Sequence, residues 1–76
     1  RQELQMESRQ IRALLEAFLR ELPKQSRILF LRRYLYGDSI SEISQRYGLG
    51  ESKVKMQLLR TRNRLYTFLE QEGMAL

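Results

Sequence analysis

The chain has 76 residues, and its 14 lysines and arginines outnumber its 9 aspartates and glutamates, giving a formal net charge of +5. This length supports one modest hydrophobic core and is too short for two. A basic excess of this size favours a polyanionic partner, either nucleic acid or an acidic membrane surface.

Several classes of protein are excluded by residues that the sequence lacks. There is no cysteine and no histidine, so disulfide bonds and the usual zinc sites are excluded. Asp38 is the only aspartate and no glycine loop suits a phosphate, so we expect no enzyme, no cofactor and no catalytic residue. No apolar run approaches the roughly 20 residues that cross a bilayer. The chain starts at Arg1 rather than at a methionine, and we interpret it as part of a longer intracellular protein.

An amphipathic helix is predicted before Pro23. From Ile11 to Leu22, apolar residues recur at the i, i+3, i+4 and i+7 spacing of one helical face. Residues 1–8 continue this pattern weakly, so residues 1–10 are either helix or linker. Pro23 ends the helix and suits the first turn of the next one, where its missing N–H would have no partner.

A second helix is predicted from about Lys24 to Tyr36. Its main apolar stripe is Ile28, Leu31 and Leu35. Other apolar and aromatic residues lie outside this stripe: Leu29, Phe30, Tyr34 and Tyr36. A helix that is apolar on most sides is usually central and packed on two faces. The alternative is that part of this surface docks a partner.

Glycines and a capping motif define a short third helix. Gly37 suits the left-handed residue that commonly closes a helix. Ser39 and Glu42 then match a capping box, in which each side chain accepts a hydrogen bond from the other residue's backbone N–H. We therefore predict a helix from about Ile40 to Tyr47, ended by Gly48.

A fourth helix is predicted to follow Gly50 and to continue to about Gln71, with Gly73 as its stop. Two helices joined by a short turn that contains glycine form a helix-turn-helix unit, which we place at residues 39–59. The sequence thus predicts an all-α fold: one compact four-helix domain over residues 1–76, without strands and without a wing.

The two helices of this unit are expected to pack through apolar side chains at i, i+4 spacing. The expected contacts join Ile43, Tyr47 and Leu49 to Val54 and Leu58. Ser44 is small where the helices must cross closely, so we expect it to be buried against the fourth helix. For this pattern alone, the alternative is a plain helical hairpin with no binding role.

The basic part of the fourth helix favours nucleic-acid binding over the plain hairpin. The segment from residue 53 to residue 64 has five basic residues and no acidic one. At about 100° per residue, one face is apolar and buried. It comprises Val54, Leu58, Thr61, Leu65, Phe68 and Leu69.

Opposite the buried face of this predicted helix lies a mostly small or neutral ridge of Ser52, Met56, Leu59 and Asn63. The ridge is flanked by Lys53 and Arg60 on one side and by Lys55 and Arg62 on the other. A recognition helix in the major groove has this layout, with base edges under the ridge and phosphates along the flanks.

The segment from Leu22 to Leu65, LPKQSRILFLRRYLYGDSISEISQRYGLGESKVKMQLLRTRNRL, resembles region 4 of bacterial RNA polymerase sigma factors. Region 4 is their C-terminal promoter-recognition domain, and the likeness is greatest to the extracytoplasmic-function type. The resemblance rests on Leu22-Pro23, Arg33-Tyr34, Ser39 to Ile43, Gly48-Leu49, Val54-Lys55 and Arg60-x-Arg62-x-x-Leu65.

The resemblance implies a cytoplasmic domain that reads the −35 promoter element of double-stranded DNA while bound to RNA polymerase. In this family the polymerase contact is the flap of the β subunit, an anti-sigma factor is a further partner, and no membrane is involved. A region 2 domain would precede residue 1. By position, the family's base contacts transfer to Glu51, Ser52, Lys55 and Met56. Its phosphate contacts transfer to Ser41, Lys53, Arg60 and Arg62.

Four positions depart from the family pattern. Gly50 stands where a Ser or Thr cap is usual, and Gln57 replaces a common arginine. Met56 replaces a small polar residue, and Glu51 is acidic where DNA is expected. These departures predict a softer start to the fourth helix and an unusual promoter sequence. Met56 suits a thymine methyl group, and Lys55 suits a guanine.

Two other functions remain open from the sequence. The first is a helix-turn-helix domain of another kind of transcription regulator, against which the arginine-rich tail argues. The second is a domain that acts mainly through protein binding, docked on the polymerase flap or held by an anti-sigma factor.

Overall fold

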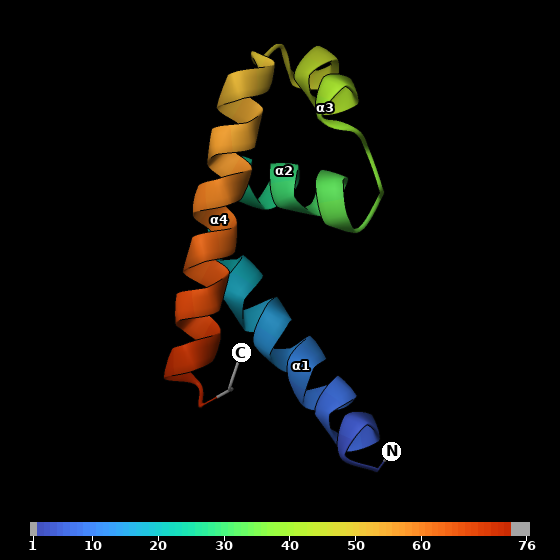
Figure 1. Cartoon of the computed structure of the whole chain (residues 1–76), viewed down its shortest axis with the longest axis vertical. Coiled ribbons are helices and arrows are strands. Elements are labelled where there is room, and N and C mark those ends of the chain that lie inside the picture. Colours follow the sequence, from blue (N-terminus) through green and yellow to red (C-terminus); the bar gives the residue numbers. More distant parts are fainter. Residues whose placement is uncertain (1, 74–76) are drawn as a thin grey trace.

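The computed structural model describes the backbone from residue 2 to residue 73, and the side chains from residue 9 to residue 73 (Figure 1). Its four helices are α1 (Gln2–Glu21), α2 (Lys24–Tyr34), α3 (Ile40–Tyr47) and α4 (Glu51–Gln71). Over the described residues there is no strand, which confirms the all-α prediction with four helices. The backbone between residues 2 and 10 is helical, as part of α1.

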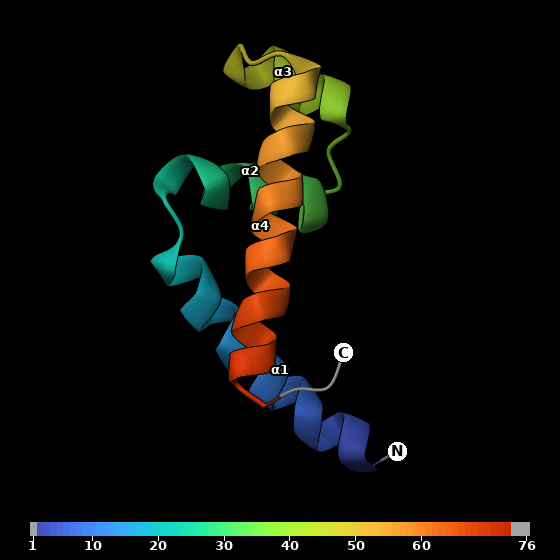
Figure 2. The same ribbon diagram turned by 60° about the vertical axis from the view of Figure 1, so that its left-hand side comes forward.

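Helix α4 is the element against which the other three pack. Figures 1 and 2 show α2 and α3 beside its N-terminal half, and α1 beside its C-terminal half. The N-terminal half of α1 diverges from α4, and the molecule measures 42 by 22 by 19 Å. The domain is therefore elongated. Among residues 9–21 of α1, the contacts with α4 lie near the C-terminal end of the helix.

The packed face of α2 differs from the predicted stripe. Leu29 and Phe30 are buried, at 1% and 7% exposure, whereas Leu35 is 69% exposed. Ile28 and Leu31 are half-buried. The prediction failed because α2 ends at Tyr34, which places Leu35 outside the regular helix, and because α4 covers the Leu29 side. The expectation of a central helix is confirmed, since α2 packs against both α3 and α4.

Two apolar clusters hold the helices together. The first lies among α2, α3 and α4; it comprises Leu29, Ile43, Val54 and Leu58, with Ile40 and Leu49 packed against it. The second joins α1 to α2 and α4 through Phe18. Its ring centroid lies 6.2 Å from that of Phe30 and 5.6 Å from that of Phe68. These are the spacings of attractive aromatic pairs.

Tyr47 and Ser44 do not lie as predicted. Tyr47 is 39% exposed and is not part of the apolar cluster, although Ile43, one turn earlier, is fully buried. One helical turn of four residues rotates the side chain by about 40°, and Tyr47 is the last residue of α3. Ser44 is half-buried, and its hydroxyl donates a hydrogen bond to the Leu49 carbonyl. Ser44 therefore stabilises the turn between α3 and α4, and it does not fill the space where the two helices cross.

The capping box at the start of α3 is confirmed. The Ser39 hydroxyl accepts a hydrogen bond from the Glu42 N–H at 3.0 Å, and the Ser39 N–H donates to Glu42 Oε1 at 2.8 Å. The two bonds satisfy two backbone donors that the first turn of a helix leaves without partners. They fix where α3 begins.

The turn between α3 and α4 is closed by a left-handed glycine. Gly48 has φ 66°, and its N–H donates to the Ser44 carbonyl. The Leu49 N–H donates to the same carbonyl at 3.1 Å. Gly50 begins α4 with φ −66° and provides no side-chain cap. The turn is short and bonded at each of its residues, so it sets the direction of α4 relative to α3.

Replacing Ser39 with alanine removes the hydroxyl that accepts from the Glu42 N–H. We expect the free energy of unfolding to fall by about 0.5–2 kcal/mol, measured by urea denaturation. Ser41→Ala is the matched control, because Ser41 is exposed and its side chain makes no hydrogen bond within residues 9–73. A larger loss from Ser41→Ala than from Ser39→Ala would contradict this assignment of the cap.

Replacing Gly48 with alanine forces a Cβ into the left-handed region. No atom lies within 4 Å of the added Cβ, so the cost comes from the backbone alone, and we expect a loss of about 1–2 kcal/mol. Gly50→Ser is the control, because it adds a capping oxygen at a residue with ordinary φ and is expected to gain a few tenths of a kcal/mol. Equal effects of the two changes would show that the turn does not depend on positive φ at Gly48.

Candidate nucleic-acid interface

Helix α4 buries the face that the sequence predicts. Val54, Leu58 and Thr61 are 0%, 4% and 3% exposed. The Thr61 hydroxyl donates to the Gln57 carbonyl at 2.9 Å, so this buried polar group is satisfied within the helix. The remaining residues of the face, Leu65, Phe68 and Leu69, are half-buried. Because this face is fixed against the core, the opposite face of α4 points away from the protein.

The four residues expected to read bases are all exposed, but only Ser52 and Met56 lie on the outward face. Lys55 lies on one flank of that face, and Glu51 lies three residues before the buried Val54, on the same side of the helix. Glu51 and Ser52 are exposed in the first turn of α4, and Lys55 and Met56 are exposed in the next. Met56 is 49% exposed, although its side chain is apolar. The negative charge of Glu51 is favourable at this position, because the N-terminus of a helix carries a partial positive charge.

The residues expected to contact phosphate are exposed as well. Lys53, Arg60 and Arg62 project from α4, and Ser41 lies in the first turn of α3. Within residues 9–73 none of the three cations forms an ion pair, so none is neutralised by the protein itself.

The basic flanks lie on opposite sides of α4. Lys55 and Arg62 line a groove of about 330 Å³ that α4 forms with the C-terminal end of α2 and the start of α3. Arg60 lines another groove of about 310 Å³, between α4 and the N-terminal end of α2, with Pro23 and Arg64. The structure therefore separates the cations as the helical periodicity predicts.

Polar contacts that the sequence did not predict hold the loop before α3 in place. They join Arg32 and Arg33 to Asp38, and we call them the latch. Arg32 Nε donates to Asp38 Oδ2 at 2.6 Å, and the guanidinium lies 4.7 Å from the centroid of the Tyr36 ring. Arg33 donates to the Asp38 carbonyl at 2.9 Å, and the Asp38 N–H donates to the Arg32 carbonyl at 2.9 Å. The hydrogen bond to Asp38 raises the pKa of Arg32 above its ordinary value. The latch ties the end of α2 to the residue before the Ser39 cap.

A signal for this latch was present in the sequence. Asp38 is the only aspartate in the chain, and it follows the left-handed Gly37 directly. A turn at Gly37 brings an acidic residue back toward the end of the preceding helix, where Arg32 and Arg33 lie.

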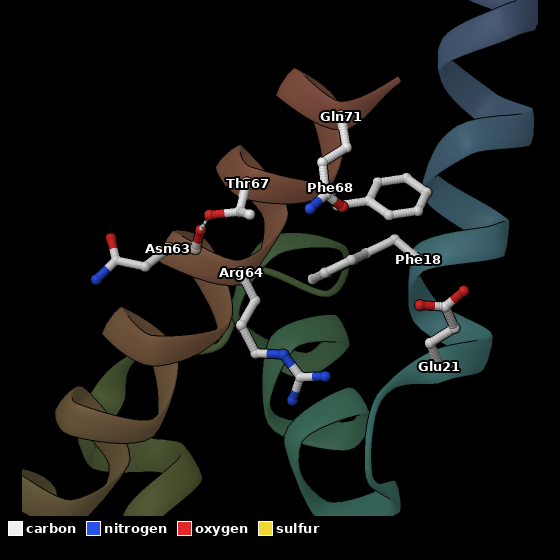
Figure 3. Close-up of a pocket in the computed structure, with 7 residues that line it drawn as sticks. All are labelled: Phe18, Glu21, Asn63, Arg64, Thr67, Phe68 and Gln71. Atoms are coloured by element: carbon white, nitrogen blue, oxygen red, sulfur yellow. Dashed lines mark hydrogen bonds between the residues drawn. The ribbon is translucent and has the colours of Figure 1, made fainter. Parts of the chain in front are cut away.

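The cleft between α1 and α4 lies away from the outward face described above. It has a volume of about 350 Å³ and is lined by Phe18, Glu21, Asn63, Arg64, Thr67, Phe68 and Gln71. Figure 3 shows the rings of Phe18 and Phe68 side by side, and the Thr67 hydroxyl bonded to the Asn63 carbonyl at 3.2 Å. Asn63 is the only residue of the predicted ridge in this cleft.

Two further properties bear on the kind of site. Among residues 2–73 no helix is long and apolar enough to cross a membrane. Over the same part of the chain, no group of acidic, histidine or cysteine side chains is placed to hold a metal ion.

Comparison with known proteins identifies the family. No curated protein matches the chain. The family model described as sigma-70, region 4 matches residues 12–65, which include all of α2 and α3 and the outward face of α4 from Glu51 to Arg62. The match covers more than half of the 76 residues and contains the whole helix-turn-helix unit. The chain therefore belongs to the sigma-70 region 4 family, the DNA-binding helix-turn-helix domains of sigma factors, which act in transcription initiation.

Proposed function

We propose that this domain recognises the −35 promoter element by laying the N-terminal half of α4 in the major groove, while the domain is docked on RNA polymerase. The observation that carries the proposal is the outward face of α4, where an exposed ridge lies between unpaired cations on both sides. Membership of the sigma-70 region 4 family supports the same function.

The dimensions of a helix and of the groove support this arrangement. The major groove is about 12 Å wide and admits one α-helix, whose diameter with side chains is about 10–12 Å. Both walls of the groove carry phosphates, so a helix lying in it benefits from cations on both of its sides. Lys53 and Arg60 would meet one phosphate strand, and Lys55 and Arg62 would lie toward the other.

The remaining contacts follow from the positions of α3 and of the first turns of α4. Ser41 lies at the N-terminal end of α3, where free backbone N–H groups and the helix dipole favour a phosphate. Glu51, Ser52, Lys55 and Met56 occupy the first turns of α4 and would reach the base edges. Lys55 is suited to a guanine, because its ammonium group can donate to the O6 and N7 acceptors.

A second exposed surface supports docking on the polymerase. Tyr34, Leu35 and Tyr36 are 47%, 69% and 62% exposed at the C-terminal end of α2. Three consecutive large side chains exposed at one end of a helix are of the kind that a protein partner covers. We propose that the flap of the β subunit binds here, and that an anti-sigma factor is a further partner of the same domain.

The phosphate contacts are tested by the salt dependence of DNA binding. Lys53→Ala and Arg60→Ala should each weaken binding to all sequences about equally and lower the slope of log K against log salt by about one unit. The measurement is fluorescence anisotropy with promoter duplexes at several salt concentrations. Arg9→Ala is the matched control, since it removes an exposed charge from α1 and should leave the slope nearly unchanged.

In the same assay, Lys55→Ala tests whether Lys55 determines which base is preferred rather than the overall affinity for DNA. Because Lys55 lies nearer the ridge, we expect it to change the preferred base at one position, with a loss of discrimination of about 1–3 kcal/mol. If Lys55→Ala instead weakened binding to all DNA sequences equally while Lys53→Ala changed the preferred base, the assignment of base-reading and phosphate-binding residues would be inverted.

The docking surface is tested with the polymerase itself. Leu35→Ala should lower the affinity of the domain for core RNA polymerase about fivefold or more, because it truncates the most exposed apolar side chain of that surface. Ile11→Ala, which shortens an exposed apolar side chain on α1, is the control. Unchanged polymerase binding after Leu35→Ala would place the docking surface elsewhere, and the salt slope for DNA should stay the same in either variant.

A further inference from the structure

Two apolar side chains stand next to each other on the outward face of α4. Met56 is 49% exposed and Leu59 is 43% exposed, and they are three residues apart, so they are neighbours on the helix surface. The segment around them, from residue 53 to residue 64, has five cations and no acidic residue. A single exposed apolar residue is ordinary, but here two adjoin in the middle of the basic surface.

The structure leaves this ridge poor in side chains that read bases by paired hydrogen bonds. Such pairs join Arg or Lys to guanine and Asn or Gln to adenine. Gln57 faces the protein instead, because it is half-buried and its Oε1 is buried without a hydrogen-bond partner. Asn63 lies about 18 Å along the helix axis from Glu51, at the edge of the cleft with α1.

The apolar chemistry of the pair matches one feature of the major groove. Among the base edges exposed there, the C5 methyl group of thymine is the apolar one. Met is flexible and fills irregular apolar gaps, so Met56 can follow a methyl group whose position varies. Leu59 supplies a branched apolar end on the same face.

The spacing of the pair matches neighbouring base pairs. Three residues advance about 4.5 Å along a helix, and successive base pairs lie about 3.4 Å apart along DNA. Two methyl groups contacted at once would therefore belong to adjacent or nearly adjacent base pairs.

We infer that Met56 and Leu59 form a pair that selects thymines on neighbouring base pairs of the target by contacting their methyl groups. This inference rests on the proposed function, because it requires α4 to lie in the major groove. It adds a residue, Leu59, to the reading surface, and it assigns the chemical class of base to that part of the site.

The test removes only the methyl group. The full chain is first used to select its preferred sequence from a library of duplexes randomised at the centre. Each thymine in the selected duplex is then replaced by uracil, which keeps the same base pairing and the same polar groups. Affinities for the thymine and uracil duplexes are compared by fluorescence anisotropy at one salt concentration.

For the parent chain we expect uracil to weaken binding about fourfold at each of two neighbouring thymines, the loss that corresponds to one buried methyl group. In Met56→Ala and in Leu59→Ala, the ratio of thymine to uracil affinity should fall to about one at one of the two positions. Leu59→Met and Met56→Leu, which keep an apolar end, should retain most of the discrimination. Tyr66→Ala is the matched control, since Tyr66 is 52% exposed on the same helix two turns beyond Leu59.

The possible failures of the inference and of the proposed function are distinct. If uracil binds as well as thymine at every position while Lys53→Ala and Arg60→Ala still lower the salt slope, the methyl-reading inference is overturned and the proposed function stands. The inference would also be overturned if Met56→Ala and Leu59→Ala both kept the full preference for thymine over uracil, because other side chains would then contact the methyl groups. If the chain selects no duplex, either alone or bound to core RNA polymerase, both proposals fail.

Discussion

The burial of Ile43 of α3 and Val54 of α4 in one apolar cluster is the constraint on which the rest of the domain depends. Both side chains are fully buried, and Leu29 of α2 and Leu58 of α4 complete the cluster around them. A helix turns about 100° per residue, so fixing Val54 against the core determines the direction of every other side chain of α4. The same cluster therefore holds three helices together and decides which residues of α4 face outward.

Local bonds on either side of this cluster determine where α3 begins and ends. The Ser39 cap fixes its first turn, and the hydrogen bonds of Ser44 to Leu49 fix the turn that follows. The latch between Arg32 and Asp38 holds the loop that leads into the cap. Arginine stays charged at any pH at which the protein is folded, so the latch does not depend on protonation of Arg32. Together these bonds give α3 and α4 one relative orientation, which a rigid reading surface requires.

The sequence predicted those features that depend on neighbouring residues. The bounds of α3 and α4, the capping box at Ser39 and the buried face of α4 were correct, because caps, glycines and helical periodicity are local signals. The stripe on α2 was wrong, since the choice of Leu29 over Leu35 depends on where α4 crosses it. The latch was missed for the same reason, because Arg32 and Asp38 meet only after the chain reverses at Gly37. For the candidate site, periodicity gave the exposure of its residues, whereas their roles toward DNA remain predictions.

Along α4, residues that are buried in the core alternate with residues that are exposed to solvent. Val54, Leu58 and Thr61 are buried in the core, and Ser52, Met56 and Leu59 are exposed. Substitutions at exposed positions usually change stability by less than about 0.5 kcal/mol. Under the proposed function, substitutions on this face would therefore change the DNA sequence that the domain prefers while its fold stays intact.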